Sequence, residues 1–319
     1  MAIGKNLYCN LYEATYSRRM RMAVIENLLI TGALTGAVYA LLALGFTLIY
    51  GVAGVVNMAH GALFMLGAFM FFAFGPLGYF GLDVFSALVL AAVFVGVAGS
   101  IVYVLTIHQI IKDMLAVLVV TIGVALLFQQ LVVIVFGAVF GSAYQAIPPL
   151  LSGYQTLLGV KVTNSRLLAA GVSLGLFALV WAFITKFKIG KAMRAVAQDR
   201  ETAMLMGINT TRLYIVTMAI SAALAATAGI FIASSTTSTA DPAMWLQPLV
   251  MSFAIVVLGG LGSIKGTLIG AFIIGYVGSA VIVFLPQESF LASTFALAIM
   301  VLVLLVRPRG IFGKRIELE

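Results

Sequence analysis

The chain has 319 residues, of which 63% are hydrophobic and only 9% are charged, and its mean hydropathy is +1.18. An ordinary soluble domain is about half apolar and about one-quarter charged, so the composition excludes a soluble enzyme and indicates an integral membrane protein. One cysteine and two histidines exclude an internal disulfide and a zinc-type ligand cluster. The net charge of +8 comes largely from basic residues that flank apolar runs, which is typical of cytoplasmic loops, so we expect lipid contact and no nucleic-acid partner.

Residues 1–23 precede the first apolar run and carry Arg18, Arg19 and Arg21. They lack the apolar core and small-residue cleavage site of a signal peptide. We expect an amino-terminal extension here. Either it lies along the outer surface as an amphipathic segment, or one early apolar run does not cross the membrane fully.

Nine charge-free apolar runs follow, each near the roughly 20 residues that a helix needs to cross a bilayer. They are Leu28–Tyr50, Gly61–Leu82, Val84–Ile107, Met114–Gly141, Leu167–Thr185, Leu213–Ala233, Pro242–Ile264, Gly266–Gln287 and Ser289–Val306. The runs lack the alternation of a membrane β-barrel. The sequence therefore predicts an all-α polytopic transmembrane bundle with about 8–9 spans, formed by one domain over residues 24–313 and followed by a cytoplasmic tail, 314–319.

The first candidate site is the break between the first two runs. Irregular backbone at membrane depth is tolerated only where protein or a water-filled cavity covers it, and transport sites use such breaks. The residues predicted to line a translocation path here are Tyr50, Gly51, Gly54, Asn57 and His60. The alternative is a plain connecting loop in which His60 caps a helix or meets lipid headgroups.

A second break contains Gly259, Gly260 and Gly262, which we also assign to the path. Lys265 precedes a glycine instead of following one, so this segment is not a phosphate-binding Walker loop. The similar placement of the two breaks indicates an internal repeat. Between them, the polar link from Ser142 to Arg166 is expected to form an outer cap.

The second candidate site is the basic loop 188–211. Read as helix, it places Met193, Val196 and Ala197 on one face, while Met204 and Leu205 continue a second short helix. Such a surface helix docks into a partner's groove or lies among lipid headgroups. Its cations predict a cytoplasmic location, as do those of the carboxyl-terminal tail.

All ten acidic residues lie outside the apolar runs. Proton- and ion-coupled carriers usually place an ionisable group inside the bundle, so we expect the energy for transport to come from another subunit.

Four blocks of sequence carry a resemblance to a known family. They are residues 45–61 (GFTLIYGVAGVVNMAHG), 190–199 with 205–209 (GKAMRAVAQD and LMGIN), 256–264 (VVLGGLGSI) and 307–313 (RPRGIFG). In order and spacing, the chain resembles the LivH-type permease subunits of branched-chain amino acid ABC transporters over roughly residues 24–313; the extension 1–21 departs from that pattern.

The resemblance implies a multi-pass protein of the plasma (inner) membrane of a prokaryote. It implies a second related permease, two cytoplasmic ATPase subunits that bind ATP and Mg, and an extracytoplasmic substrate-binding protein. This chain itself would hold no cofactor, metal or catalytic residue. The residues expected to couple it to the ATPases are Gly190, Arg194, Asp199, Gly207 and Asn209. The alternatives are a permease for urea, short amides or another small polar solute, and an ATP-independent channel.

Overall fold

The computed structural model describes residues 2–111, 113–157, 159–285, 287, 291–308 and 310–313, with side chains from Val24 onward. The helices of the first half are α1 (Ala2–Ala53), α2 (Ala59–Phe74), α3 (Val84–Val102), α4 (His108–Ile110), α5 (Met114–Phe140) and α6 (Asn164–Lys186). Those of the second half are α7 (Lys188–Gln198), α8 (Arg200–Leu205), α9 (Thr210–Ile232), α10 (Leu246–Gly259), α11 (Ile264–Phe284) and α12 (Ala292–Val306). Two π-helical turns, η1 (Tyr103–Ile107) and η2 (Ala233–Thr237), extend α3 and α9.

Every one of the nine predicted apolar runs contains a helix, which confirms the all-α polytopic class. Within the described residues, six helical stretches are long and apolar enough to cross a membrane: Val24–Ala53, Val84–Ile110, Met114–Phe140, Asn164–Lys186, Thr210–Thr237 and Ile264–Phe284. The remaining apolar helices, α2, α10 and α12, are shorter than the usual span.

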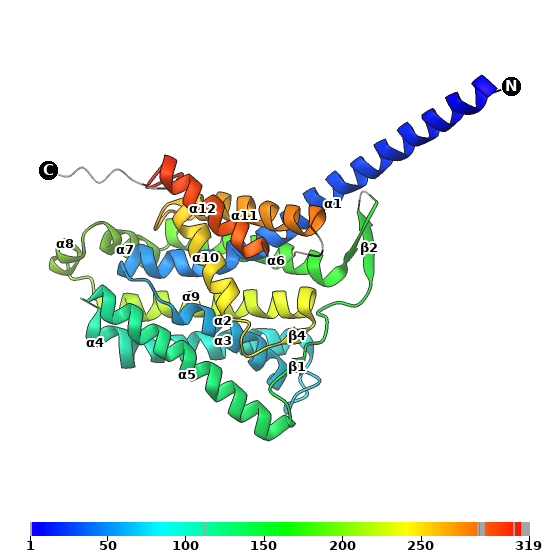
Figure 1. Ribbon diagram of the computed structural model, residues 1–319. Helices are drawn as coiled ribbons and strands as arrows, with labels where there is room; N and C mark the ends of the chain where they lie inside the picture. Colours follow the sequence, from blue (N-terminus) through cyan, green and yellow to red (C-terminus); the bar gives the residue numbers. More distant parts are fainter. Residues whose placement is uncertain are drawn as a thin grey trace.

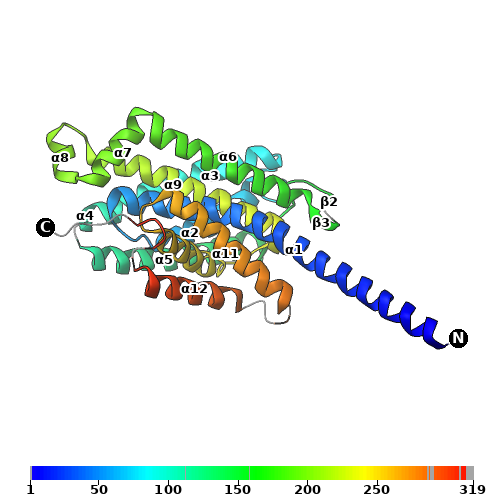
Figure 2. The same cartoon turned by 90° about the horizontal axis from the view of Figure 1, so that it is seen from above.

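Figure 1 shows α7 and α8 at one end of the bundle and the strands at the other; we call these the α7–α8 end and the hairpin end. Helix α1 runs through the middle and packs against α6, α9, α10 and α11, so the side chains from Ala40 to Leu44 are fully buried. Its first part projects from the hairpin end, whereas α12 ends toward the α7–α8 end (Figures 1 and 2).

Close helix packing depends on glycine at particular positions. A Cβ atom on Gly275 of α11 would lie 2.6 Å from the Cα of Gly36 in α1, which is closer than any real side chain allows. Gly171 and Gly175 lie four residues apart, a spacing that favours close helix packing, yet a Cβ on either would meet nothing within 4 Å in this chain.

The polar link from Ser142 to Arg166 forms a cap at the hairpin end, as its composition predicts. Strands β2 (Tyr154–Leu157) and β3 (Val160–Thr163) pair as an antiparallel hairpin. Strand β1 (Gln145–Ala146) pairs with β4 (Thr239–Ala240), which follows η2. The cap therefore ties the α5–α6 link to the segment between α9 and α10.

Candidate translocation path and coupling segment

The two predicted glycine breaks meet in space. The structure interrupts the helices at both: α1 ends at Ala53 and α2 begins at Ala59, while α10 ends at Gly259 and α11 begins at Ile264. A Cβ on Gly51 would contact the Cα of Gly262 at 3.5 Å. Both breaks need left-handed backbone, with φ of +70° at Gly54 and +79° at Gly262, and glycine adopts this conformation at little cost.

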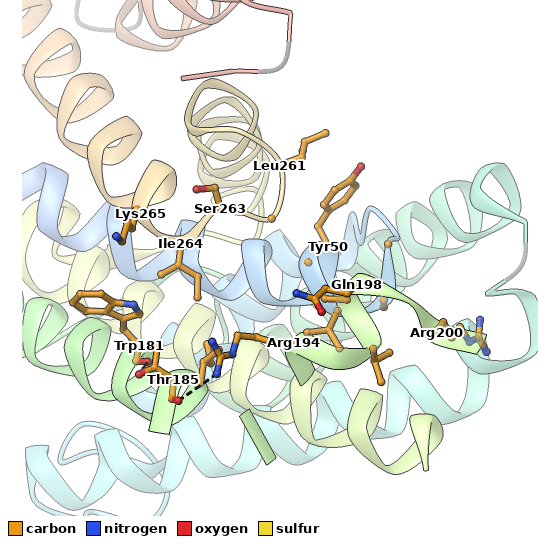
Figure 3. A pocket seen from close by; sticks show the side chains of 18 of the residues that line it. Tyr50, Trp181, Thr185, Arg194, Gln198, Arg200, Leu261, Ser263, Ile264 and Lys265 are labelled. Atoms are coloured by element: carbon orange, nitrogen blue, oxygen red, sulfur yellow. Dashed lines mark hydrogen bonds between the residues drawn. The ribbon is translucent and has the colours of Figure 1, made fainter. Parts of the chain in front are cut away.

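A cavity of about 870 Å³ opens beside these breaks at the α7–α8 end (Figure 3). Its walls come from the carboxyl ends of α1 and α6, from α7, and from the α10–α11 loop. The predicted residues that line it are Tyr50, Gly51, Gly54, Gly262 and Arg194. Residues assigned separately to the path and to ATPase coupling therefore share one cavity.

The cavity carries positive charge. Arg194, Arg200 and Lys265 line it, and none of its described lining residues is acidic. One guanidinium nitrogen of Arg194 donates to the backbone carbonyl of Thr185 at 3.3 Å, drawn as a dashed line in Figure 3, which ties α7 to the end of α6. A solute without net positive charge is therefore favoured in this cavity.

Asn57 and His60 lie elsewhere. Both are buried, with exposures of 1% and 0%, and the cavities described here do not include them. The Nε2 of His60 lies 3.0 Å from the carbonyl oxygen of Leu42, an acceptor only, so the ring donates this bond. Asn57 caps α2 through its Oδ1, which accepts from the amide of Ala59 at 3.0 Å. His60 therefore links α2 to α1 through this hydrogen bond. Because its side chain is buried, it does not contact lipid headgroups.

Gly259 and Gly260 serve close backbone packing. A Cβ on Gly259 would lie 2.4 Å from backbone atoms of Gly266, and one on Gly260 would lie 2.5 Å from the amide nitrogen of Gly313. The amides of Ile311 and Phe312 donate to the carbonyls that end α10, at 2.9 and 3.0 Å. Glycine at these two positions therefore lets the last described residues of the chain pack against the end of α10.

A second cavity, of about 240 Å³, lies at the hairpin end. Both cavities are lined by residues of α1 and α11, and we call the contact between these two helices the seam. Between the two cavities α1 and α11 are joined by the hydroxyls of Thr47 and Thr267, 2.6 Å apart, and Phe46 packs edge-to-face on Phe253 with ring centroids 6.1 Å apart. These contacts form a closed layer that separates the two cavities.

Sequence reasoning missed the polar residues of this hairpin-end cavity. They are Thr35, Arg166, Ser235, Thr236, Thr237, Gln247 and Ser279. The available signals were the hydroxyl run from Ser234 to Thr239, directly after an apolar run, and an arginine directly before one. Only the fold shows that the two signals belong to one cavity.

The coupling segment forms α7 and α8, as predicted, but its faces differ in part from the prediction. Met193 and Val196 are buried, with exposures of 2% and 3%, because α7 packs against α1, α6 and α9. Ala197, expected on the same face, is exposed because it lines the large cavity instead of packing against a helix. The large apolar side chains that this segment leaves exposed are Ile189 of α7 and, at α8 and its end, Met204, Leu205 and Met206.

The predicted coupling residues set the shape of this segment. A Cβ on Gly190 would lie 2.4 Å from the Cα of Ile184, so glycine allows the tight α6–α7 turn. Asp199 accepts from the amides of Glu201 and Thr202 and caps α8, while Asn209 caps α9. Gly207, with φ of +81°, ends α8.

An apolar helical bundle with six membrane-length helices among its described residues is the architecture of a multi-pass membrane protein. The sequence model of the branched-chain amino acid transport system permease component matches residues 28–304. The chain therefore belongs to this family of permease components.

Similar proteins agree with that assignment. The chain is 30% identical over 306 residues to the high-affinity branched-chain amino acid transport system permease protein BraD of Pseudomonas aeruginosa, covering 90% of this chain and 95% of BraD. It is 32% identical to the corresponding permease protein LivH of Escherichia coli K12, covering 89% and 94%. Among solved structures, PsaBC from Streptococcus pneumoniae in complex with Fab matches 88% of this chain and 92% of its own with a TM-score of 0.50 and 15% identity, which shows a shared fold alone.

Proposed function

We propose that this chain is the transmembrane permease subunit of an ATP-driven ABC importer for branched-chain amino acids. It receives solute from an extracytoplasmic binding protein and releases it toward the cytoplasm. A second related permease pairs with it, and two cytoplasmic ATPase subunits bind and hydrolyse ATP with Mg. The chain itself catalyses no reaction and holds no cofactor in this proposal.

The observation that carries the proposal is the family match across residues 28–304, combined with the positions in the structure of the sequence blocks that carry the family resemblance. Blocks that are far apart in the sequence meet at one cavity, whose wall includes Arg194 of the α7 helix. A movement of α7 driven by an ATPase therefore acts directly on the wall of the path. An ATP-independent channel has no use for such a helix.

The proposal also assigns about 8–9 spans. Added to the six long helices, α2, α10 and α12 would complete the bundle. Helix α2 has 16 residues, a length of about 24 Å, which is short for a bilayer core of about 30 Å. Most of its residues are buried within the protein, so it meets little lipid and need not match the bilayer thickness.

The test is to purify the chain together with its neighbouring gene products and reconstitute the complex in liposomes. We expect leucine-loaded binding protein to stimulate ATP hydrolysis and to drive leucine uptake. Uptake of urea or short amides in place of leucine would overturn the substrate assignment. ATP-independent flux through this chain alone would overturn the importer.

A further inference from the structure

The hairpin-end cavity combines a charged end with an apolar floor. It lies between the second half of α1, the start of α6, η2, the start of α10 and the end of α11. Val38, Met251 and Ile274 contribute apolar surface. Leu34, Ile232 and Ile282 add to this surface, and the polar residues named above line the same space, so the cavity is amphipathic.

Arg166 supplies the positive charge. It follows directly on the cap, in the first turn of α6, and lines both this cavity and an adjoining cavity of about 450 Å³. None of the described residues lining either cavity is an aspartate or a glutamate. Arg166 is half-buried, and a charge taken out of water is costly unless it pairs with a counter-charge or serves a ligand. The described cavity walls offer no counter-charge, so an anionic group from outside the chain is the fitting partner.

Hydroxyl groups surround the same space. Thr35 and Ser279 line both cavities with Arg166, and Ser235, Thr236 and Thr237 enter from η2. A π-helical turn is rare and frequently occurs at functional sites. Here it turns consecutive hydroxyl side chains toward the cavity in place of the apolar face that α9 presents before it.

We propose that this cavity is the entry site for the substrate of the permease, in which the guanidinium of Arg166 binds the α-carboxylate of an aliphatic amino acid. The hydroxyls of η2, with Thr35 and Ser279, meet the polar groups of the zwitterion. The apolar floor takes its side chain. Charge-assisted bonds between guanidinium and carboxylate are among the strongest that a protein makes, so Arg166 sets the requirement for a carboxylate. The proposal rests on the proposed function and names the group of the substrate that this subunit recognises.

The first experiment measures ligand protection of a cysteine placed in the cavity, independently of transport. In a chain with Cys9→Ser, Thr236→Cys puts a thiol at an exposed position of the lining, and a membrane-impermeant methanethiosulfonate reagent modifies it in the reconstituted complex. We expect millimolar L-leucine to slow modification and leucinamide, which lacks the carboxylate, to have no effect. Adding Arg166→Gln should abolish protection. A cysteine at the exposed Tyr154 of the hairpin is the control that leucine should not protect.

The second experiment measures leucine uptake and stimulated ATP hydrolysis by the complete transporter. Arg166→Gln should lower uptake by about tenfold or more, and Arg166→Lys should recover part of it. Lys161→Gln removes a charge from the cap, where Lys161 lies over the ring of Tyr154, and should leave uptake unchanged.

These outcomes separate the two proposals. Normal uptake by Arg166→Gln, or equal protection by leucine and leucinamide, would overturn the carboxylate site. Loss of complex assembly in both Arg166 variants would also overturn it, by making Arg166 a structural contact. If the unaltered transporter imports no leucine although leucine protects Thr236→Cys in the expected pattern, the proposed function fails and the site stands.

Discussion

Single glycines in this chain differ in what surrounds them, and the difference decides what a methyl group would do at each. Gly275 faces the backbone of Gly36 at a distance that leaves no room for a Cβ. Gly171 lies on α6 with open space around it. Sequence spacing alone treats the two positions alike, because both belong to small-residue patterns four residues apart.

The first prediction compares alanine at these two positions. Gly275→Ala should lower the free energy of unfolding by about 1–3 kcal/mol, because the added carbon forces α1 and α11 apart. Gly171→Ala should change it by less than about 1 kcal/mol, in the stabilising direction, since alanine favours helix. Thermal unfolding of the purified chain in detergent measures both. Equal effects at the two positions would show that the close approach of α1 and α11 is wrong.

At the scale of elements, the coupling segment divides its apolar residues between the core of the bundle and an exposed surface. Met193 is 2% exposed and belongs to the core, whereas Met206 is 79% exposed. Methionine is flexible and suits an adaptable docking surface. The two side chains therefore offer a matched pair for separating folding from association.

The second prediction uses that pair. Met206→Ser should leave the unfolding temperature unchanged and reduce co-purification of the ATPase, since burial of a methionine in a partner's groove is worth about 1.5–3 kcal/mol. Met193→Ser should instead destabilise the chain by about 2–5 kcal/mol. If Met206→Ser retains the ATPase fully, the exposed end of α8 is no docking surface.

The third prediction concerns the cap of α8. The hydroxyl and amide of Thr202 donate to the Asp199 carboxylate and hold its pKa below the usual value, which is about 3.9. A lowered pKa in the folded state means that the cap stabilises α8 above about pH 4 and loses this effect as the pH falls through the lowered value. Hydrogen exchange at the Thr202 amide should therefore speed up below that pH. Asp199→Asn, which caps without titrating, should not show the change beyond the intrinsic effect of pH on exchange.

The sequence predicts a feature well when its cause lies within one short stretch of the chain, and poorly when it depends on the packing of distant elements. Charge-free runs of about 20 residues are sufficient to place the nine apolar helices, and Gly207 marks the end of α8. The meeting of Gly51 with Gly262 is not local, because it needs α1 to lie against α11. The hairpin-end cavity is still less predictable, since Arg166 and the η2 hydroxyls come together only once five separate elements are packed.

For the whole molecule, the two cavities and the closed layer between them describe one seam through the bundle. The larger cavity opens at the α7–α8 end and the smaller lies at the hairpin end. Thr47 and Thr267 join the two helices in the layer between the cavities.

Alternating access at this seam requires α1 and α11 to separate at the layer. We therefore expect a reversible disulfide between Thr47→Cys and Thr267→Cys, with Cys9→Ser, to stop uptake, and a reductant to restore it in the same proteoliposomes.

The orientation of that seam in the membrane follows from charge. Eight basic residues belong to α7, to α8, to the adjoining ends of α6, α9 and α12, or to the wall of the large cavity, and so lie toward the α7–α8 end. They are Lys186, Lys188, Lys191, Arg194, Arg200, Arg212, Lys265 and Arg307. Among the side chains described from Val24 onward, the basic residues of the hairpin end are Lys161 and Arg166. The positive-inside rule places the α7–α8 end in the cytoplasm. Arg18, Arg19 and Arg21 oppose this assignment, because they belong to the part of α1 that projects from the hairpin end.

Labelling of intact cells with an impermeant maleimide resolves the conflict. Helix α1 has 52 residues, a length of about 78 Å, so it extends well beyond a bilayer core of about 30 Å on the side where it projects. In a Cys9→Ser chain, Tyr154→Cys should react from outside, and Gln198→Cys, at the exposed end of α7, only after permeabilisation. Native Cys9 should react from outside together with position 154, because one continuous helix joins it to the hairpin end. If Cys9 of the unaltered chain stays unlabelled in intact cells while Tyr154→Cys of the Cys9→Ser chain is labelled, then α1 does not continue straight through Arg18, Arg19 and Arg21, and these three charges keep the amino terminus in the cytoplasm.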